Sequence, residues 1–321
     1  MKKLYHTLVQ FLLVFPILVL VLSSCGQTAA QGQELIQKIL QANPRIASAG
    51  DVSCMEVHKG LTVIESDLMM QDSSENHLFI IEVDLDKGLS LRTSTPADLP
   101  YSRETGLQNM LQQAQAAQRN GQKVLLGVNA DVFGFYEGLD FLSPRGVVYV
   151  DGQERSTCRK DENVFYILKD GSAHLDKFED FVQVEPEVEQ AVGGWHTLVW
   201  DGQLHTADEY PEKNLVMVNP RTFIGLSADS RKVYLFVVDG RQPGYSRGFL
   251  MEDMVKVCQA TGCQRACNLD GGGSTTLVIR EDLLQGKEAG QEFVLLNAPS
   301  DLVQGKRTPR KVANGLLVIE K

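Results

Sequence analysis

The sequence predicts an α+β fold, a single domain with a large mixed β-sheet and a few packed helices. Apolar runs of strand length outnumber helical patterns by about three to one. Strands and helices do not alternate along the chain as they would in a protein built from βαβ units. The hydrophobic content of 43% is ordinary for a globular protein with a core.

The predicted strands are short and are separated by turn residues. Three Asp-Gly pairs lie between such runs and predict hairpin turns. They are Asp151-Gly152, Asp170-Gly171 and Asp201-Gly202. The clearest strand ranges are 78–83, 89–92, 123–128, 147–150, 164–168, 223–226, 233–238, 275–279 and 316–319.

Two segments have the pattern of an amphipathic helix. Apolar residues from Leu107 to Ala114 recur at helical spacing and predict a helix over 104–120. Over 250–260 the apolar residues again share one face, and a glycine follows the segment. A weaker helical pattern covers 35–40.

The N-terminus is typical of an exported lipoprotein. Lys2 and Lys3 precede an apolar run over 8–22, which is short for a membrane span and suits a signal peptide. The run ends in Leu-Ser-Ser-Cys, which resembles a bacterial lipobox, so we expect cleavage before Cys25 and a lipid on its sulfur. The alternative is an ordinary signal peptide followed by an unrelated cysteine.

The chain is therefore expected to have three parts. Residues 1–24 are a lipoprotein signal peptide, 25–50 a tether and short helix, and 51–321 the catalytic domain. The lipid on Cys25 would make the membrane a partner and place the protein in the cell envelope, periplasmic or surface-exposed.

Charge and cysteine content exclude other classes. The net charge of −10 argues against a nucleic-acid partner, because phosphate binding requires clustered Lys and Arg. Of six cysteines, five are left after Cys25, so at least one is free or paired between chains. Cys258, Cys263 and Cys267 lack the histidines and the spacing of a zinc site. We expect Cys258 and Cys267 to be buried, and one local disulfide could form.

Three apolar runs end abruptly at polar residues in Gly-rich turns. These ends are 129–131 (Asn-Ala-Asp), 239–241 (Asp-Gly-Arg) and 268–270 (Asn-Leu-Asp). Such strand ends converge where sheet proteins tend to bind ligands. Three glycines and Ser274 follow Asp270, and consecutive glycines let backbone N–H groups approach an anion. An isolated Asp-Gly is usually a plain turn, but three glycines at roughly 0.5–1 kcal/mol each favour a functional interpretation.

Residues 239–248 and 268–274 closely resemble the phosphodiester glycosidase family, whose best-known member removes N-acetylglucosamine from a sugar phosphodiester. The resemblance extends from about residue 75 to the C-terminus. The run Ala130-Asp131-Val132-Phe133 departs from the family, which has small residues and two aromatics there. Shorter elements agree in order: Val83-Asp84-Leu85, Val128-Asn129, Ser143-Pro144-Arg145-Gly146, Gly193-Gly194, Pro220-Arg221-Thr222 and Val312-Ala313-Asn314-Gly315.

The candidate catalytic carboxylates are Asp270, Asp239 and Asp131. Asp239 and Asp270 could form the pair that glycoside cleavage uses, or one of them could only hold an arginine or cap a turn. Arginines in Gly-rich turns suit phosphate oxygens, although the alternative is a solvated surface arginine. The residues expected to bind substrate are Asn129, Arg221, Thr222, Arg241, Arg247, Asn268, Gly271, Gly272, Gly273, Ser274 and Asn314.

Together, the residues and the resemblance predict a hydrolase that cleaves the glycosidic C–O bond of a sugar-1-phosphodiester in envelope or extracellular glycans. A phosphate departs readily, so one carboxylate and phosphate-neutralising arginines would suffice. No cofactor or obligatory metal is expected, although a divalent cation is left open. One alternative is a phosphodiesterase that breaks the P–O bond with a metal held by Asp131, Asp239 and Asp270. The other is a non-catalytic glycan-binding lipoprotein.

Overall fold

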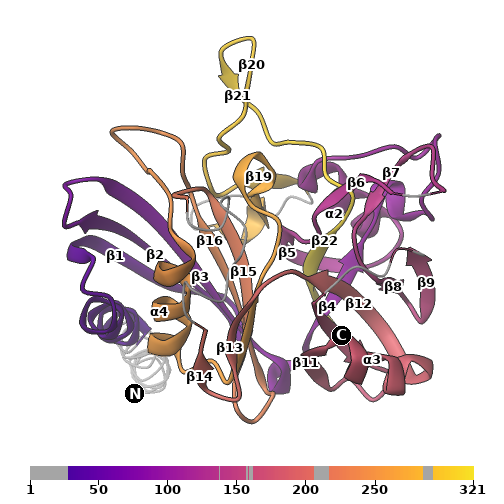
Figure 1. Ribbon diagram of the computed structural model, residues 1–321, viewed down its shortest axis with the longest axis horizontal. Coiled ribbons are helices and arrows are strands. Elements are labelled where there is room, and N and C mark those ends of the chain that lie inside the picture. Colours follow the sequence, from indigo (N-terminus) through magenta and orange to yellow (C-terminus); the bar gives the residue numbers. More distant parts are fainter. Residues whose placement is uncertain (1–27, 137, 157, 159–161, 206–216, 285–291) are drawn as a thin grey trace, which may run out of the picture.

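The computed structural model describes residues 28–136, 138–156, 158, 162–205, 217–284 and 292–321. Strands make up most of the regular secondary structure in these ranges, and helices lie on the outside (Figure 1). The α+β class predicted from the sequence is confirmed. Every strand pairing recorded within the described ranges is antiparallel, and the strands are divided among three main sheets.

The largest sheet has eight strands within the described ranges. In spatial order they are β1 (Ile46–His58), β2 (Leu61–Met70), β3 (Glu75–Asp84), β16 (Lys232–Val238), β15 (Arg221–Leu226), β17 (Arg265–Asn268), β13 (Thr197–Trp200) and β14 (Gln203–Leu204). The second sheet consists of β19 (Phe293–Leu295), β18 (Leu277–Arg280), β5 (Lys123–Asn129), β22 (Gly315–Glu320) and β4 (Leu89–Ser94). The third consists of β11 (Ala173–Lys177), β10 (Asn163–Leu168), β12 (Val188–Gly194), β8 (Val148–Val150) and β9 (Gln153–Ser156).

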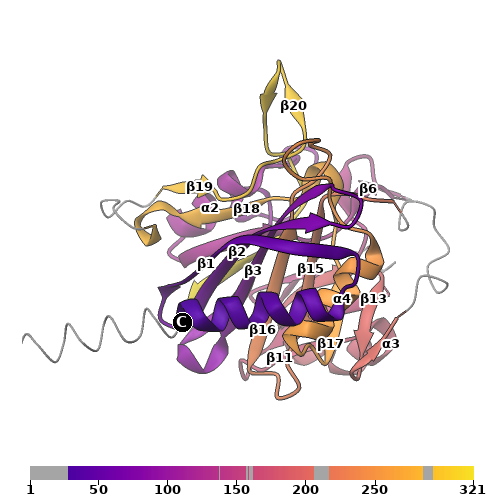
Figure 2. The same ribbon diagram turned by 90° about the vertical axis from the view of Figure 1, so that its left-hand side faces the viewer.

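Two short hairpins and several helices complete the described structure. The hairpins are β6 (Phe133–Phe135) with β7 (Leu142–Pro144), and β20 (Leu302–Val303) with β21 (Lys306–Arg307). The β20–β21 hairpin projects from the rest of the chain in both ribbon views (Figures 1 and 2). The helices are 28–42, α2 (Met110–Arg119), α3 (Phe178–Val184) and α4 (Met251–Thr261).

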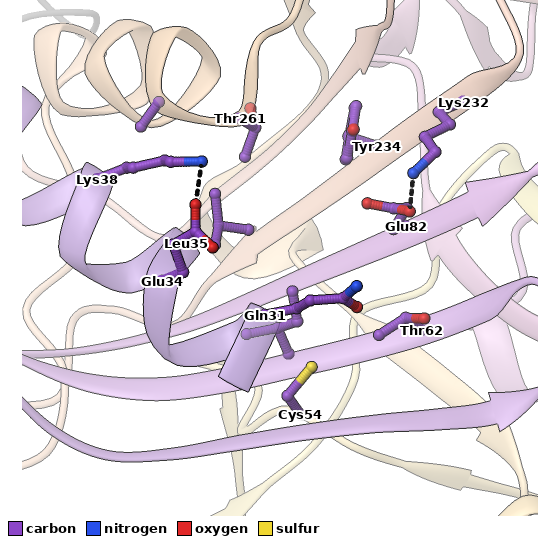
Figure 3. A pocket seen from close by; sticks show the side chains of 12 residues that line it. Gln31, Glu34, Leu35, Lys38, Cys54, Thr62, Glu82, Lys232, Tyr234 and Thr261 are labelled. Carbon is purple, nitrogen blue, oxygen red and sulfur yellow. Dashed lines mark hydrogen bonds and ion pairs between the residues drawn. The ribbon is translucent and has the colours of Figure 1, made fainter. Parts of the chain in front are cut away.

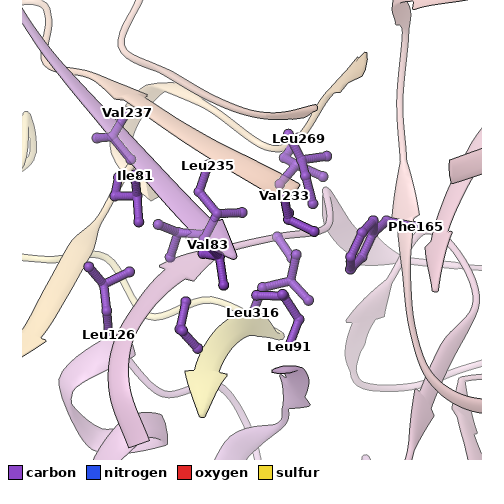
Figure 4. Packing of buried hydrophobic residues seen from close by; sticks show 14 of the residues in the cluster. Ile81, Val83, Leu91, Leu126, Phe165, Val233, Leu235, Val237, Leu269 and Leu316 are labelled. Carbon is purple, nitrogen blue, oxygen red and sulfur yellow. The ribbon is translucent and has the colours of Figure 1, made fainter. Parts of the chain in front are cut away.

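Both faces of the largest sheet are buried, which explains why its central strands read as continuous apolar runs. On β3, Phe79 and Ile81 face a core shared by all three sheets, and Ile80 faces the opposite side. Figure 4 shows the shared core, where side chains of the largest sheet meet Leu126, Leu316 and Phe165 of the other two. The opposite side is covered by helix 28–42 and α4, which lie next to each other across the sheet in Figure 2.

Helix α2 is shorter than predicted. It begins at Met110, because Asn109 caps it and exchanges hydrogen bonds with Gln112 in a capping box. Residues 104–109 of the predicted helix therefore lie outside it. Its buried face packs on the outer side of the second sheet.

The three Asp-Gly hairpins are confirmed. They join β8 to β9, β10 to β11 and β13 to β14. Cys258 and Cys267 are buried, as predicted. The local disulfide is not formed, since none of Cys258, Cys263 and Cys267 is disulfide-bonded.

The N-terminal segment is integrated into the fold from residue 28 onward. Ile36 and Ile39 of helix 28–42 are buried against the largest sheet. Strand β1 crosses the boundary expected at residue 50, because it pairs with β2 from Ile46. The signal peptide and Cys25 lie outside the described residues. Among the residues that are described, no helix is long and apolar enough to cross a bilayer.

Candidate active site

The glycine run after Asp270 lies where several strand ends meet. It connects β17 to β18. The Asp270 N–H donates to Ala130 O (2.7 Å), just beyond β5, and the Leu269 N–H donates to Thr222 O (3.0 Å) on β15. The Gly272 N–H donates to Pro220 O (2.9 Å). These bonds join the 129–131 and 268–270 strand ends, which are far apart in sequence.

The side chains of Asn129 and Thr222 stabilise this junction through hydrogen bonds. Both are fully buried. The Asn129 amide donates to Asp270 O (2.7 Å), and its Oδ1 accepts from the Thr222 hydroxyl (2.8 Å) and the Thr276 N–H (3.0 Å). Their polar atoms are occupied by the protein itself, so both residues position the loop and present no free group to a substrate.

Asp131 and Asp270 line one small, narrow pocket. Arg145, Trp195 and the backbone of Gly193-Gly194 line it with them. The Arg145 guanidinium lies over the Trp195 ring, 5.2 Å from its centroid. The pocket therefore combines two carboxylates, a cation and an aromatic ring, which are groups suited to a charged sugar derivative.

Asn314 fixes the orientation of Asp131. Its Oδ1 accepts from the Asp131 N–H (2.9 Å), and its amide donates to Asp131 Oδ2. Asn314 is fully buried and Asp131 nearly so. Asn314 therefore acts as a positioning residue for a pocket carboxylate.

Asp270 has the electrostatics of a functional carboxylate. Burial raises the pKa of the Asp270 carboxyl to about 6, although the Ser274 hydroxyl and the Gly271 N–H favour the charged form. The charges of Arg310 and Arg241 act in the same direction as those hydrogen bonds. A carboxyl that titrates near neutral pH in a pocket is typical of a catalytic acid or base.

The guanidinium groups of two arginines lie close to the backbone of the glycine run. Gly272 has a φ of +62°, and a Cβ there would lie 2.9 Å from Arg241 Nη2. A Cβ on Gly273 would collide with the Arg310 guanidinium and the Asp301 carboxylate. The glycines are needed because both guanidiniums approach the backbone closely.

The two guanidiniums differ in their partners. Arg310 forms a two-pronged ion pair with Asp301, at 2.8 and 3.1 Å. Arg241 donates through Nε (3.1 Å) and Nη2 (3.0 Å) to the neutral amide oxygen of Asn219. Its side chain is exposed and has no carboxylate partner among the described residues, so its charge is free to meet an anion.

Buried polar atoms around the loop have no partner within the described chain. They are Asn268 Oδ1 and Thr275 Oγ1, which belong to residues about 2% exposed. Unsatisfied buried groups of this kind are rare and are consistent with a ligand or a water. Ser274, beside them, is fully buried.

Asp239 is placed differently from Asp131 and Asp270. Its carboxylate accepts from the Asn297 amide (2.8 Å), the Ala298 N–H (2.9 Å) and the Tyr245 hydroxyl (2.9 Å). Burial raises the pKa of Asp239, and those three hydrogen bonds oppose the rise. Only 1% of Asp239 is exposed, so its position fits a residue that holds the 297–298 segment and not one that contacts substrate.

Arg221 and Arg247 do not line the pocket either. Arg221 is buried and donates to Phe249 O (3.0 Å) and Met217 O (2.6 Å). Burial, followed by repulsion from Arg241, lowers the pKa of Arg221 to about 10. Arg247 is exposed and forms an ion pair with Asp72 (3.0 Å).

The carboxylates of the metal-dependent alternative are not assembled. No group of three or more His, Cys, Asp or Glu side chains within the described ranges is placed to hold a metal ion. Asp239 uses its oxygens on Asn297, Ala298 and Tyr245 and does not join Asp131 and Asp270 in the pocket.

A larger pocket lies elsewhere, between helix 28–42 and the largest sheet (Figure 3). Its charged groups pair with each other, Lys38 with Glu34 (2.8 Å) and Lys232 with Glu82 (2.5 Å). None of the predicted site residues lines it, so it is not the site described above.

Sequence reasoning did not select Arg145, Trp195 or Arg310 as site residues. Arg145 belongs to the Ser143-Pro144-Arg145-Gly146 element, and Trp195 follows the Gly193-Gly194 pair, so these motifs were an available signal. Arg310 lies outside the quoted elements, two residues before Val312, and the fold brings it to Gly273.

Comparison with known proteins gives a family and a fold. The sequence profile of the phosphodiester glycosidase family matches residues 122–319, more than half of the chain. No curated protein sequence matches significantly.

Among solved structures, the chain resembles the catalytic domain of zebrafish N-acetylglucosamine-1-phosphodiester alpha-N-acetylglucosaminidase, auto-inhibited by its pro-peptide. The TM-score is 0.60 with 21% identity, over 85% of this chain and 88% of that one. It also resembles a hypothetical protein from Synechocystis, with a TM-score of 0.54 and 13% identity over 86% of this chain and 65% of that one.

Proposed function

Because the chain belongs to the phosphodiester glycosidase family, we propose that it hydrolyses the glycosidic C–O bond of a sugar-1-phosphodiester. The family prediction from the sequence is thereby confirmed. The observation that carries the proposal is the pocket shared by Asp131 and Asp270, next to a glycine run contacted by Arg241. We assign the substrate to glycans of the cell envelope or the extracellular space.

Asp270, Arg241 and Asp131 have different roles in the proposed reaction. Asp270, when ionised, either stabilises positive charge at the anomeric carbon or takes a proton from the attacking water. The C1–O bond breaks and the phosphate leaves as an anion, which the free charge of Arg241 stabilises. The products are a free sugar and a phosphomonoester. Asp131 is the second carboxylate facing the reacting centre.

Hydrolysis in water enriched in ¹⁸O tests which bond breaks. If the glycosidic bond breaks, the oxygen from water is attached to C1, and mass spectrometry finds the label in the sugar. Label in the phosphate would show that the P–O bond breaks and would support a phosphodiesterase instead. Binding of phosphodiesters without turnover by the full-length protein would support the non-catalytic alternative.

We further propose that a lipid on Cys25 anchors the protein in the cell envelope. The Leu-Ser-Ser-Cys sequence supports this proposal. Cells fed a labelled fatty acid should incorporate it into the wild-type protein and not into the Cys25→Ala variant. The variant should be released from the membrane fraction, whereas Cys54→Ala, a matched substitution within the folded part, should behave as wild type. Label that persists on Cys25→Ala would contradict the anchor.

A further inference from the structure

A pocket distinct from both of those described above lies next to the turn that carries Arg241, and it is named the second pocket. It is formed by the 48–50 backbone of β1, by β2 and β3, and by the tip of the 239–248 turn. Its side chains are partly apolar and partly acidic. Those relevant to its chemistry are Asp67, Leu68, Met69, Glu75 and Tyr245.

Tyr245 forms a fixed aromatic surface in this pocket. Its hydroxyl donates to Asp239 (2.9 Å), and its ring stacks on His77 at a centroid distance of 5.4 Å and an interplanar angle of 27°. His77 is itself held between Glu65 (2.8 Å) and Asp67 (2.5 Å). Because His77 covers one face of the ring and 37% of Tyr245 is exposed, the opposite face and edge are available to a ligand.

Hydrogen-bond acceptors surround the ring. Asp67 uses Oδ1 on His77 and keeps Oδ2 available, and no described residue donates a hydrogen bond to the Glu75 carboxylate. An aromatic face flanked by carboxylate acceptors matches the apolar C–H face and the hydroxyl donors of a sugar ring. A negatively charged ring would be repelled by these carboxylates.

The turn links this pocket to the candidate active site. Gln242 and Ser246 pair across the turn, with Tyr245 inside the turn and Arg241 directly before it. Tyr245 is four positions after Arg241, a span of at most about 14 Å. A substrate whose phosphate meets Arg241 could therefore continue to Tyr245 through its aglycone, the part that leaves with the phosphate.

We propose that this second pocket is an aglycone subsite, which binds a neutral, hydroxyl-rich glycan segment attached to the phosphate. The proposal rests on the proposed function for its link to Arg241. The strand residues of the pocket precede the range 122–319 that matches the family profile, whereas Gly244 and Tyr245 lie within it.

Two substrates that differ only in the aglycone test the subsite. Each carries the same sugar-1-phosphate, joined either to methanol or to a trisaccharide (cellotriose, mannotriose and chitotriose in turn). We expect the full-length protein to prefer at least one trisaccharide substrate. Tyr245→Ala should lower this preference about tenfold relative to Tyr245→Phe, because the Phe variant also loses the bond to Asp239 but keeps the ring. Glu75→Gln should lower it too, whereas Glu252→Gln, an exposed carboxylate on α4, should not.

A binding measurement separates failure of the subsite from failure of the proposed function. Saturation-transfer NMR with the free trisaccharides should detect binding to wild type and to Tyr245→Phe, and a loss of at least tenfold in affinity for Tyr245→Ala, even if no phosphodiester is hydrolysed. Equal substrate preference in Tyr245→Ala and Tyr245→Phe would overturn the subsite. So would the absence of binding of all three trisaccharides to the wild-type protein.

Discussion

Asp270→Asn is expected to lower kcat/KM for a sugar-1-phosphodiester by about 10³-fold or more, which corresponds to about 4 kcal/mol of transition-state stabilisation. Asn keeps the shape of the side chain and loses the charge. The pocket offers Asp131 as a second carboxylate, but Asp131 is committed to Asn314 on one oxygen. Steady-state kinetics on the full-length protein would measure the loss, and near-normal turnover would end the catalytic assignment of Asp270.

The pH dependence should change with the same substitution. Burial raises the pKa of Asp270 to about 6, and our mechanism needs the ionised form. For wild type, kcat/KM should therefore rise as the pH increases through about 6 and then level off. The Asp270→Asn variant should lack this rise. A wild-type profile that falls through the same range would indicate that Asp270 works as an acid instead.

Stability distinguishes catalysis from a structural role for Asp270. Since the pKa is raised in the folded state, the protonated form is favoured on folding, and this stabilisation is lost as the pH rises through about 6. Asp270→Asn should consequently leave the melting temperature at pH 7.5 unchanged or higher. Asp239→Asn is the matched contrast, because it disturbs three hydrogen bonds to a buried carboxylate and should lower the melting temperature. A lower melting temperature for Asp270→Asn would indicate that its carboxylate holds the loop.

Features set by short stretches of sequence were predictable. In each of the three Asp-Gly hairpins the glycine has a positive φ, as at Gly152, Gly171 and Gly202, so the hairpins followed from the residues alone. The glycine run after Asp270 was likewise a local signal. The start of α2 was mistaken because the pattern from Leu107 has helical spacing, whereas the capping box of Asn109 and Gln112 sets the boundary.

The roles of the site residues depend on distant partners, which the sequence does not display. Asp239 and Asp270 both precede a glycine and follow an apolar run, yet Asp239 meets Asn297 and Ala298, nearly sixty residues further on. Arg247 lies in the same turn as Arg241, but it pairs with Asp72 on the β2–β3 connection. Only the fold decides which carboxylate or guanidinium is already satisfied by the protein.

Arg241→Lys is expected to lower kcat/KM about 100-fold for a phosphodiester and less than tenfold for a neutral aryl glycoside of the same sugar. Lys keeps the positive charge but loses the planar fork that matches phosphate oxygens. The backbone cost is the same for both side chains, since Arg241 already has a φ of +59°. The two substrates share the sugar, so the difference between the losses reports on the phosphate.

Arg247→Lys is the matched control for this prediction, because Arg247 belongs to the same turn and is exposed and paired with Asp72. It should affect both substrates by less than twofold. The alternative role of Arg241 is to hold the turn through its two hydrogen bonds to Asn219. In that case Arg241→Lys would slow both substrates equally and lower the melting temperature, and Asn219→Ala would do the same. Among the described residues the Arg241 side chain donates hydrogen bonds only to a neutral amide, and it is exposed, so we expect a selective loss on the phosphodiester.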